Sequence, residues 1–161
     1  GRVVACRHIE KLRGLQGRIM TLKVEAVFEP DAATPLARPV CLVRVSAGFP
    51  SPADDYLEGK LDLNQHLIKH PAATFFVRVT GDSMTGAGIH SGDLLIVDRS
   101  LEPTDNTVVI AIVDGELTVK RLSRQQGRLM LLPDNDKYPP MEIREESLQV
   151  WGVVTHVVHK V

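Results

Sequence analysis

An apolar segment, a two-residue turn and an alternating segment follow one another at residues 108–122, and this pattern constrains the fold most strongly. The run Val108-Val-Ile-Ala-Ile-Val113 is uninterrupted by polar residues. It is far too short to span a bilayer but has the length of a buried strand. Asp114-Gly115 comes next, a dipeptide that favours the tight turn of a β-hairpin. The alternating segment Glu116–Leu122 completes the pattern, which therefore predicts an antiparallel hairpin inside a β-sheet.

Other short segments with strand-like patterns surround this hairpin. The predicted strands are Thr74–Thr80, Asp93–Arg99, Thr107–Asp114, Glu116–Leu122, Arg128–Leu132 and Ser147–Val158, each with period-2 alternation or a continuous apolar pattern. A short helix is predicted over Leu63–Lys69, ending at His70-Pro71. Aromatic residues make up only 4% of the chain, so the core must be aliphatic. We therefore predict a mostly β fold with short helices.

The N-terminal region has a different character. Pro30, Pro35 and Pro39 fall within ten residues, and each removes a backbone donor. We interpret residues 30–39 as an extended arm. Residues 1–19 contain five Arg or Lys and a single acid. We interpret them as a disordered or non-native leader, with Met20 as the natural start; a small basic helix that contacts DNA or a filament is the alternative.

Charge and cysteine content exclude several classes of protein. The formal net charge is −1, which is unlike the basic domain of a typical nucleic-acid binder, so direct sequence-specific DNA binding is not expected. Cys6 and Cys41 have no partner at metal-ligand spacing, and we interpret them as free thiols in a reducing compartment. Residues 1–20 lack the apolar core of a signal peptide. These observations predict a cytoplasmic protein without a membrane segment.

One serine and one lysine are the candidate catalytic residues. Ser83 lies in Gly81-Asp-Ser-Met84, and the glycines around it allow a tight turn that would expose its hydroxyl. A serine needs a base to accept its proton, and Lys120 stands 37 positions downstream. A lysine can be that base only if burial lowers its pKa.

Strand alternation alone does not predict that Lys120 is buried. It shares a face with Thr118 and Glu116, whereas Leu117 and Val119 point the other way. A nearby Glu116 carboxylate would also raise the pKa of the lysine, which is the wrong direction for a base. Burial must therefore come from other elements, and the apolar strands that contain Val77, Ile96 and Ile110 are the candidates for it.

Residues 81–99 resemble the LexA/UmuD family of self-cleaving peptidases. The resemblance runs from about Ala47 to the C-terminus and is also carried by Gly48-Phe-Pro-Ser-Pro-Ala-Asp-Asp-Tyr56, Asp62-Leu-Asn-Gln65, His70-Pro71, Asp114-Gly-Glu116 and Trp151-Gly-Val-Val-Thr-His-Val-Val158. It implies a twisted β-sheet or pseudo-barrel like the LexA C-terminal domain, with an extended N-terminal arm. It further implies that residues 1–47 are a leader and cleavable arm and that residues 48–161 form a Ser/Lys peptidase-like β domain.

The resemblance also implies roles for individual residues. Ser83 would be the nucleophile, its backbone N–H an oxyanion donor, and Lys120 the general base. Ala47-Gly48 would be the scissile dipeptide, 35 residues before Ser83 measured from Gly48. Ala87-Gly88 repeats the same dipeptide, so position and the Phe-Pro that follows Gly48 carry the assignment. No metal or other cofactor is expected for this chemistry.

The partners expected from the resemblance belong to the SOS response to DNA damage. A RecA–single-stranded DNA filament would stimulate self-cleavage, and the product would act as a homodimer with a UmuC-like Y-family polymerase in translesion synthesis. A self-cleaving repressor of the LexA type is one alternative, although 47 residues that include a proline-rich part leave little room for a helix-turn-helix domain. A binding module that keeps the fold without the activity is the other.

Remaining polar residues give weaker signals. His66 and His70 stand four apart on the predicted helix, but a third metal ligand is not evident, so an exposed helix face is favoured. His156 and His159 do not share a strand face, and we expect both at the surface. Asp93 and Asp98 bracket a predicted strand, and we interpret them as turn residues.

Overall fold

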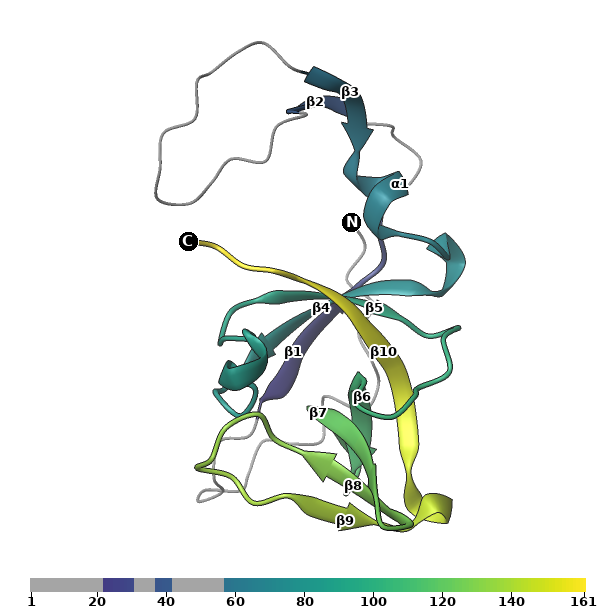
Figure 1. The fold of residues 1–161 in the computed structure, drawn as a ribbon, viewed down its shortest axis with the longest axis vertical. Helices are drawn as coiled ribbons and strands as arrows, with labels where there is room; N and C mark the ends of the chain where they lie inside the picture. The colour runs from purple at the N-terminus through teal and green to yellow at the C-terminus, as the bar shows by residue number, and fades with distance from the viewer. Residues whose placement is uncertain (1–21, 31–36, 42–56) are drawn as a thin grey trace. The chain divides into compact units, whose positions relative to one another are not determined.

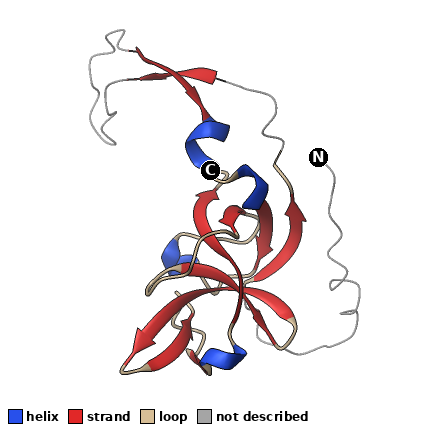
Figure 2. Cartoon of the chain, turned by 90° about the vertical axis from the view of Figure 1, so that its right-hand side faces the viewer, coloured by secondary structure: helices blue, strands red, loops and turns tan. Residues whose placement is uncertain are grey.

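The computed structural model describes residues 22–30, 37–41 and 57–161, which divide into two compact units. Residues 22–30 and 70–161 belong to the larger unit, and residues 37–41 and 57–69 to the smaller one. Strands dominate the described chain and helices are short (Figure 2), so the predicted mostly β fold is confirmed. None of the described helices has the length and apolar character needed to cross a membrane.

The larger unit is built on antiparallel strands that close into a barrel (Figure 1). Its strands are β1 (Lys23–Phe28), β4 (Thr74–Thr80), β5 (Leu94–Asp98), β6 (Val108–Val113), β7 (Glu116–Gln125), β8 (Arg128–Leu132), β9 (Met141–Ile143) and β10 (Gln149–Val158). The order around the barrel is β1-β4-β5-β10-β6-β7, and β1 also pairs with β7, which closes the ring of six strands. β8 and β9 continue the sheet from β7. Short 3-10 helices occur at η1 (Pro71–Ala73), η2 (Thr85–Ala87) and η3 (Glu145–Ser147).

The barrel closes where Leu22 and Lys23 meet β7. Lys23 is the register partner of Thr118. The carbonyl of Leu22 accepts hydrogen bonds from the backbone N–H of Val119 at 3.3 Å and from the hydroxyl of Thr118 at 3.2 Å. The sequence analysis predicted no strand in this segment. This closure places the main chain of Leu22 beside the part of β7 that leads to Lys120.

The core of the larger unit is aliphatic, as predicted. Among the described residues, every hydrophobic side chain that is buried belongs to Val, Leu, Ile, Met or Ala. One cluster fills the barrel around Val77, Leu95, Ile110 and Val119. A second cluster packs β8 against β6 and β10. Each such side chain contributes roughly 1.5–3 kcal/mol when it is fully buried, so these clusters hold the strands that carry the candidate site.

The predicted strands agree with those observed, with small shifts at their ends. β4 and β8 have the predicted bounds, β7 continues to Gln125, and β5, β6 and β10 are slightly shorter than predicted. Asp114 and Gly115 have φ values of 51° and 79°, as the predicted two-residue hairpin turn requires. β9 was not predicted, because three residues after Pro139-Pro140 are too few to show a period.

The smaller unit consists of one hairpin and one helix. β2 (Ala37–Cys41) pairs with β3 (Leu57–Asp62), and α1 (Leu63–Leu67) follows directly. The carboxylate of Asp62 caps this helix by accepting the N–H of Asn64 at 2.9 Å. The prediction of a helix to Lys69 was wrong, because Ile68 is already extended. α1 buries none of its own residues, and a helix without tertiary packing is not stable enough to continue.

Candidate active site

Ser83 lies in residues 81–88, the first part of the connection from β4 to β5, called here the nucleophile loop. Gly81 has a φ of 111° and Gly88 a φ of 74°, values that side chains other than glycine rarely adopt. Between them, Met84 points into the barrel core and has no exposed surface. Ser83 is also fully buried. The expectation that the turn exposes its hydroxyl was therefore wrong, because Leu22 and Lys120 both hydrogen-bond to it.

The structure brings together the serine and the lysine that the sequence singled out. Nζ of Lys120 lies 3.0 Å from Oγ of Ser83. The same Nζ donates a hydrogen bond to the carbonyl of Val119 at 3.1 Å. A neutral amine in this position can keep the bond to Val119 and accept the serine proton with its lone pair. The geometry thus suits proton transfer between the two side chains.

Burial lowers the pKa of Lys120 to about 8. Its side chain is only 2% exposed, although it lies on a strand face with Thr118 and Glu116. Leu22 and the nucleophile loop cover this part of the face, as the hydrogen bonds to Thr118 and Ser83 show. The carboxylate of Glu116 pairs with Lys23 at 3.1 Å. Desolvation is therefore what moves the pKa of Lys120, in the direction that a general base needs.

Leu22 is a site residue that the sequence analysis missed. Its backbone N–H donates to Oγ of Ser83 at 2.9 Å, and its carbonyl is held by β7. The signal in the sequence is the alternation of apolar and charged residues from Leu22 to Ala26. This contact shows that an extended main chain fits between β7 and Ser83, which is how a peptide segment binds as an added strand.

The connection between β8 and β9 anchors the nucleophile loop. The amide of Asn135 donates to the carbonyl of Asp82 at 2.8 Å, and the N–H of Gly86 donates to the carbonyl of Asp134 at 2.7 Å. The hydroxyl of Tyr138 donates to the carboxylate of Asp82 and, as the largest cause, lowers the pKa of that carboxyl. Arg121, which follows Lys120, bonds to the carboxylate of Asp134 at 2.9 Å. The loop that carries the serine and the strand that carries the lysine are therefore joined through one connection.

Gly86→Ala is expected to lower the melting temperature by several degrees and to weaken the anchoring of the nucleophile loop. A Cβ at this position would lie 2.6 Å from the carbonyl oxygen of Asp134, so the two loops must separate. Gly88→Ala is the matched control. Its Cβ would meet nothing within 4 Å, so it carries only the backbone cost of about 1 kcal/mol. Thermal unfolding of both variants checks this, and an equal or smaller loss for Gly86→Ala contradicts it.

The fold is mostly β and places one serine against one buried lysine, and comparison with known proteins gives the family. The profile described as Peptidase S24-like matches residues 39–155. The chain is 50% identical to Protein SamA of Salmonella typhimurium over 141 residues, which are 88% of this chain and 96% of the relative. It is 47% identical to Protein ImpA of Escherichia coli over 132 residues (82% and 90%) and 44% identical to Protein MucA of Escherichia coli over 138 residues (84% and 93%). The chain belongs to the Peptidase S24-like family, and its resemblance to the LexA/UmuD family is confirmed.

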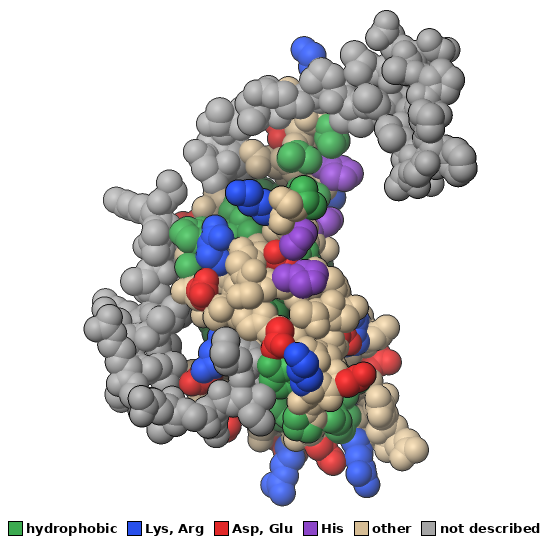
Figure 3. Space-filling view, turned by 90° about the vertical axis from the view of Figure 1, so that its left-hand side faces the viewer, with side chains coloured by type: hydrophobic (Ala, Val, Ile, Leu, Met, Phe, Trp, Pro, Cys, Tyr) green, Lys and Arg blue, Asp and Glu red, His purple; other side chains and the backbone are tan. Residues whose placement is uncertain are grey.

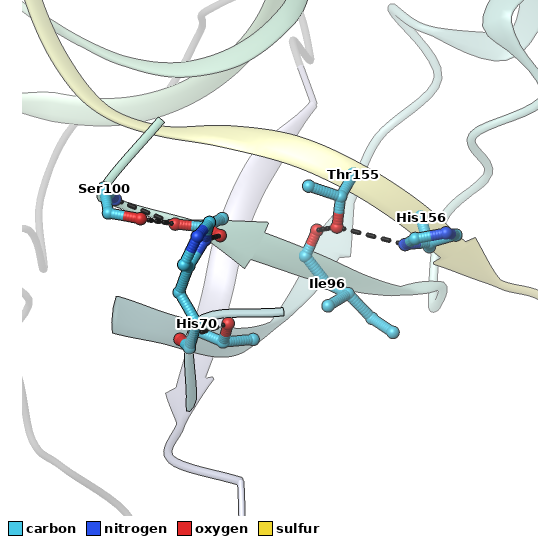
Figure 4. A network of polar contacts seen from close by, with 7 residues as sticks. His70, Ile96, Ser100, Thr155 and His156 are labelled. Atoms are coloured by element: carbon cyan, nitrogen blue, oxygen red, sulfur yellow. Dashed lines mark hydrogen bonds and ion pairs between the residues drawn. The ribbon is translucent and has the colours of Figure 1, made fainter. Parts of the chain in front are cut away.

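Other sequence candidates lie apart from this site or outside the described residues. Ala47 and Gly48 are among the residues that the structure does not describe. His66 and His70 do not share a helix, because α1 ends at Leu67. Instead, Nδ1 of His70 lies 2.6 Å from the carboxylate of Asp98, which also accepts hydrogen bonds from Ser100 (Figure 4).

Proposed function

We propose that this chain is a self-processing serine peptidase in which Ser83 is the nucleophile and Lys120 the general base. The observation that carries the proposal is the 3.0 Å contact between Oγ and the Nζ of a lysine that is 2% exposed and has a pKa of about 8. Membership of a serine peptidase family supports the same chemistry. Both proposed reacting groups are present and in contact, which supports a peptidase over a binding module without activity.

The proposed reaction has two stages. Neutral Lys120 accepts the hydroxyl proton of Ser83 while Oγ forms a bond to the carbonyl carbon of Ala47. Backbone N–H groups of the nucleophile loop, with that of Ser83 as the first candidate, stabilise the oxyanion. The bond from Ala47 to the nitrogen of Gly48 then breaks, and the ammonium of Lys120 gives its proton to this nitrogen. Water hydrolyses the resulting ester, which frees Ser83.

The proposed substrate is the chain's own Ala47-Gly48 bond. Two small residues allow the carbonyl to approach a nucleophile that lies at the bottom of a covered site. An extended main chain already binds beside the two proposed reacting groups at Leu22, and the substrate segment would take the place of Leu22 there. Val43 and Val45 precede the dipeptide at alternate positions, so both would point to the same side of such a strand.

The proposed biological role is that of a UmuD-like protein of SOS mutagenesis. A RecA–single-stranded DNA filament would stimulate the cleavage. Residues 48–161 would then form a homodimer that serves a UmuC-like Y-family polymerase in the cytoplasm as its accessory subunit. The close similarity to SamA, ImpA and MucA over most of the chain supports this role.

Intact mass of the purified full chain over time, with and without RecA filament, tests the proposal. The expected result is a fragment that begins at Gly48, and Ser83→Ala should reduce its formation to background. The variant loses one oxygen in a buried site, so it should fold like the unchanged chain. Cleavage at the same bond in Ser83→Ala would falsify the assignment. If the chain stays intact under all conditions, the alternative of a folded binding module without peptidase activity is supported instead.

A further inference from the structure

Two side chains with metal-ligand atoms are held in one tight turn before β5. The N–H of Asp93 donates to the carbonyl of His90 at 3.2 Å, which closes the turn. The N–H of His90 donates in return to Oδ2 of Asp93 at 2.8 Å. β4 holds the turn in place through Val79. The N–H of Gly92 donates to the carbonyl of Val79 at 2.8 Å, and the N–H of Val79 donates to the carbonyl of Asp93 at 3.1 Å. The Asp93 carboxylate is therefore oriented before any ligand arrives.

A third side chain reaches this turn from the other end of the sequence. β10 runs antiparallel to β5, and Val158 is the register partner of Leu94. The residue after Val158 therefore comes opposite the residue before Leu94, which places His159 beside Asp93. Nδ1 of His159 lies 2.7 Å from Oδ1 of Asp93. Strand register thus explains a cluster that sequence spacing does not show.

The three groups have the separations of a metal site that is nearly formed. Their ligand atoms all lie within 4.8 Å of one another. The histidine nitrogens lie 2.7 and 3.8 Å from the carboxylate oxygens of Asp93. Ligand atoms at about 2.0–2.1 Å from a tetrahedral Zn²⁺ are about 3.3 Å apart, a separation that lies between these two distances. Both imidazoles are about half exposed and can rotate, whereas Asp93 is 4% exposed.

We propose that His90, Asp93 and His159 bind one divalent transition-metal ion of the Zn²⁺ type. Two imidazoles and one carboxylate match the ligand preference of such ions, and water would complete the shell on the solvent side. A neutral imidazole binds a metal ion through its unprotonated nitrogen, and binding through Nδ1 of His159 would replace the contact of that atom with Asp93. Figure 3 shows histidine side chains exposed next to acidic atoms on one face of the molecule, where an ion can enter.

Asp93 is a turn residue and His159 a surface residue, as the sequence predicted, but their contact was not predicted. The proposed metal site is separate from the serine and lysine pair. The ion would tie the C-terminal end of β10 to the turn that begins β5. Other described histidines lack such a set: His70 meets the carboxylate of Asp98, and His156 turns toward the hydroxyl of Thr155 at 3.1 Å (Figure 4).

Calorimetric titration of the tag-free full chain with ZnCl₂ tests the proposal. One saturable site per chain is expected, and excess Zn²⁺ should raise the melting temperature by roughly 5 °C. His90→Ala and His159→Ala should each weaken binding at least about tenfold, since even changes outside the ligand shell cost that much. Both positions are half-exposed, so the variants should melt like the unchanged chain without metal.

His156→Ala is the matched control, because this histidine is exposed on β10, three residues before His159, and belongs to no such cluster among the described residues. It should bind Zn²⁺ as tightly as the unchanged chain. A Cys6→Ser/Cys41→Ser variant should do the same, which separates this site from thiol binding. Absence of a saturable site, or equal affinity after the His90 and His159 substitutions, overturns the proposal.

Discussion

Lys120→Arg is expected to abolish self-cleavage at every pH, whereas the unchanged chain should cleave roughly tenfold faster at pH 10 than at pH 7. The pKa of Lys120 is lowered to about 8 by burial. At pH 7 about a tenth of the molecules then hold a neutral amine, and at pH 10 nearly all of them do. The rate should follow this fraction and level off above about pH 9. Arginine keeps its proton throughout this range and cannot accept one from Ser83.

The measurement is the rate of appearance of the Gly48 fragment in buffers from pH 6 to pH 11, without filament. Lys160→Arg is the matched control, since this lysine is exposed and belongs neither to the nucleophile loop nor to the connection that anchors it. It should reproduce the profile of the unchanged chain. A flat profile, or residual cleavage by Lys120→Arg, would show that a group other than Lys120 takes the serine proton.

The sequence identified the candidate pair but not the environment that buries it. Ser83 and Lys120 could be singled out from residue type and spacing together with the resemblance to the LexA/UmuD family. The burial of Lys120 could not be predicted, since the alternation along β7 places Lys120 on the same strand face as Glu116. That face is covered by Leu22 and the nucleophile loop, which are 98 and 37 positions away from Lys120 in the sequence. The period-2 pattern of a strand shows which residues share a face, but it does not show which distant segment covers that face.

The fold shows the same division between local and long-range information. The β6–β7 hairpin was predictable, because its strands are adjacent and Asp114-Gly115 specifies the turn. The closure of the barrel by β1 was not predictable, because Lys23 pairs with Thr118, which is distant in the sequence and linked to it by no local pattern. The same holds for His159 and Asp93, which meet only because β10 lies beside β5. Local patterns thus predicted six of the ten described strands, and strand order brought the distant side chains together.

Anchoring of the nucleophile loop also depends on segments that are distant in sequence. Asp82 next to the serine is bonded by Asn135 and Tyr138, and Arg121 next to the lysine is bonded to Asp134. A displacement of the β8–β9 connection would therefore affect both members of the pair. This explains why the largest effects are expected from changes at Lys120 and from loss of the loop contacts, rather than from the exposed charges around them.

Lys120→Met is expected to stabilise the protein by about 2 kcal/mol at pH 7. A pKa of about 8, in place of 10.5, means that burying the ammonium costs about 3 kcal/mol. Methionine has a similar length, is unbranched and carries no charge. Loss of the hydrogen bond to the carbonyl of Val119 offsets about 1 kcal/mol of the gain. For a chain of 161 residues the melting temperature should rise by roughly 4–8 °C.

The pH dependence separates this cause from improved packing. Since the folded pKa of Lys120 lies below the unfolded value, the cost is complete below about pH 8. Between about pH 8 and pH 10.5 the unfolded chain binds more protons than the folded chain, so the cost of burying Lys120 decreases as the pH rises through this range. Chemical denaturation in a Ser83→Ala background, which prevents cleavage, should therefore show a gain from Lys120→Met at pH 7 that shrinks by pH 10. Lys160→Met, at an exposed position, should change neither value. A gain that is independent of pH would mean that packing, and not the buried amine, limits the stability of this site.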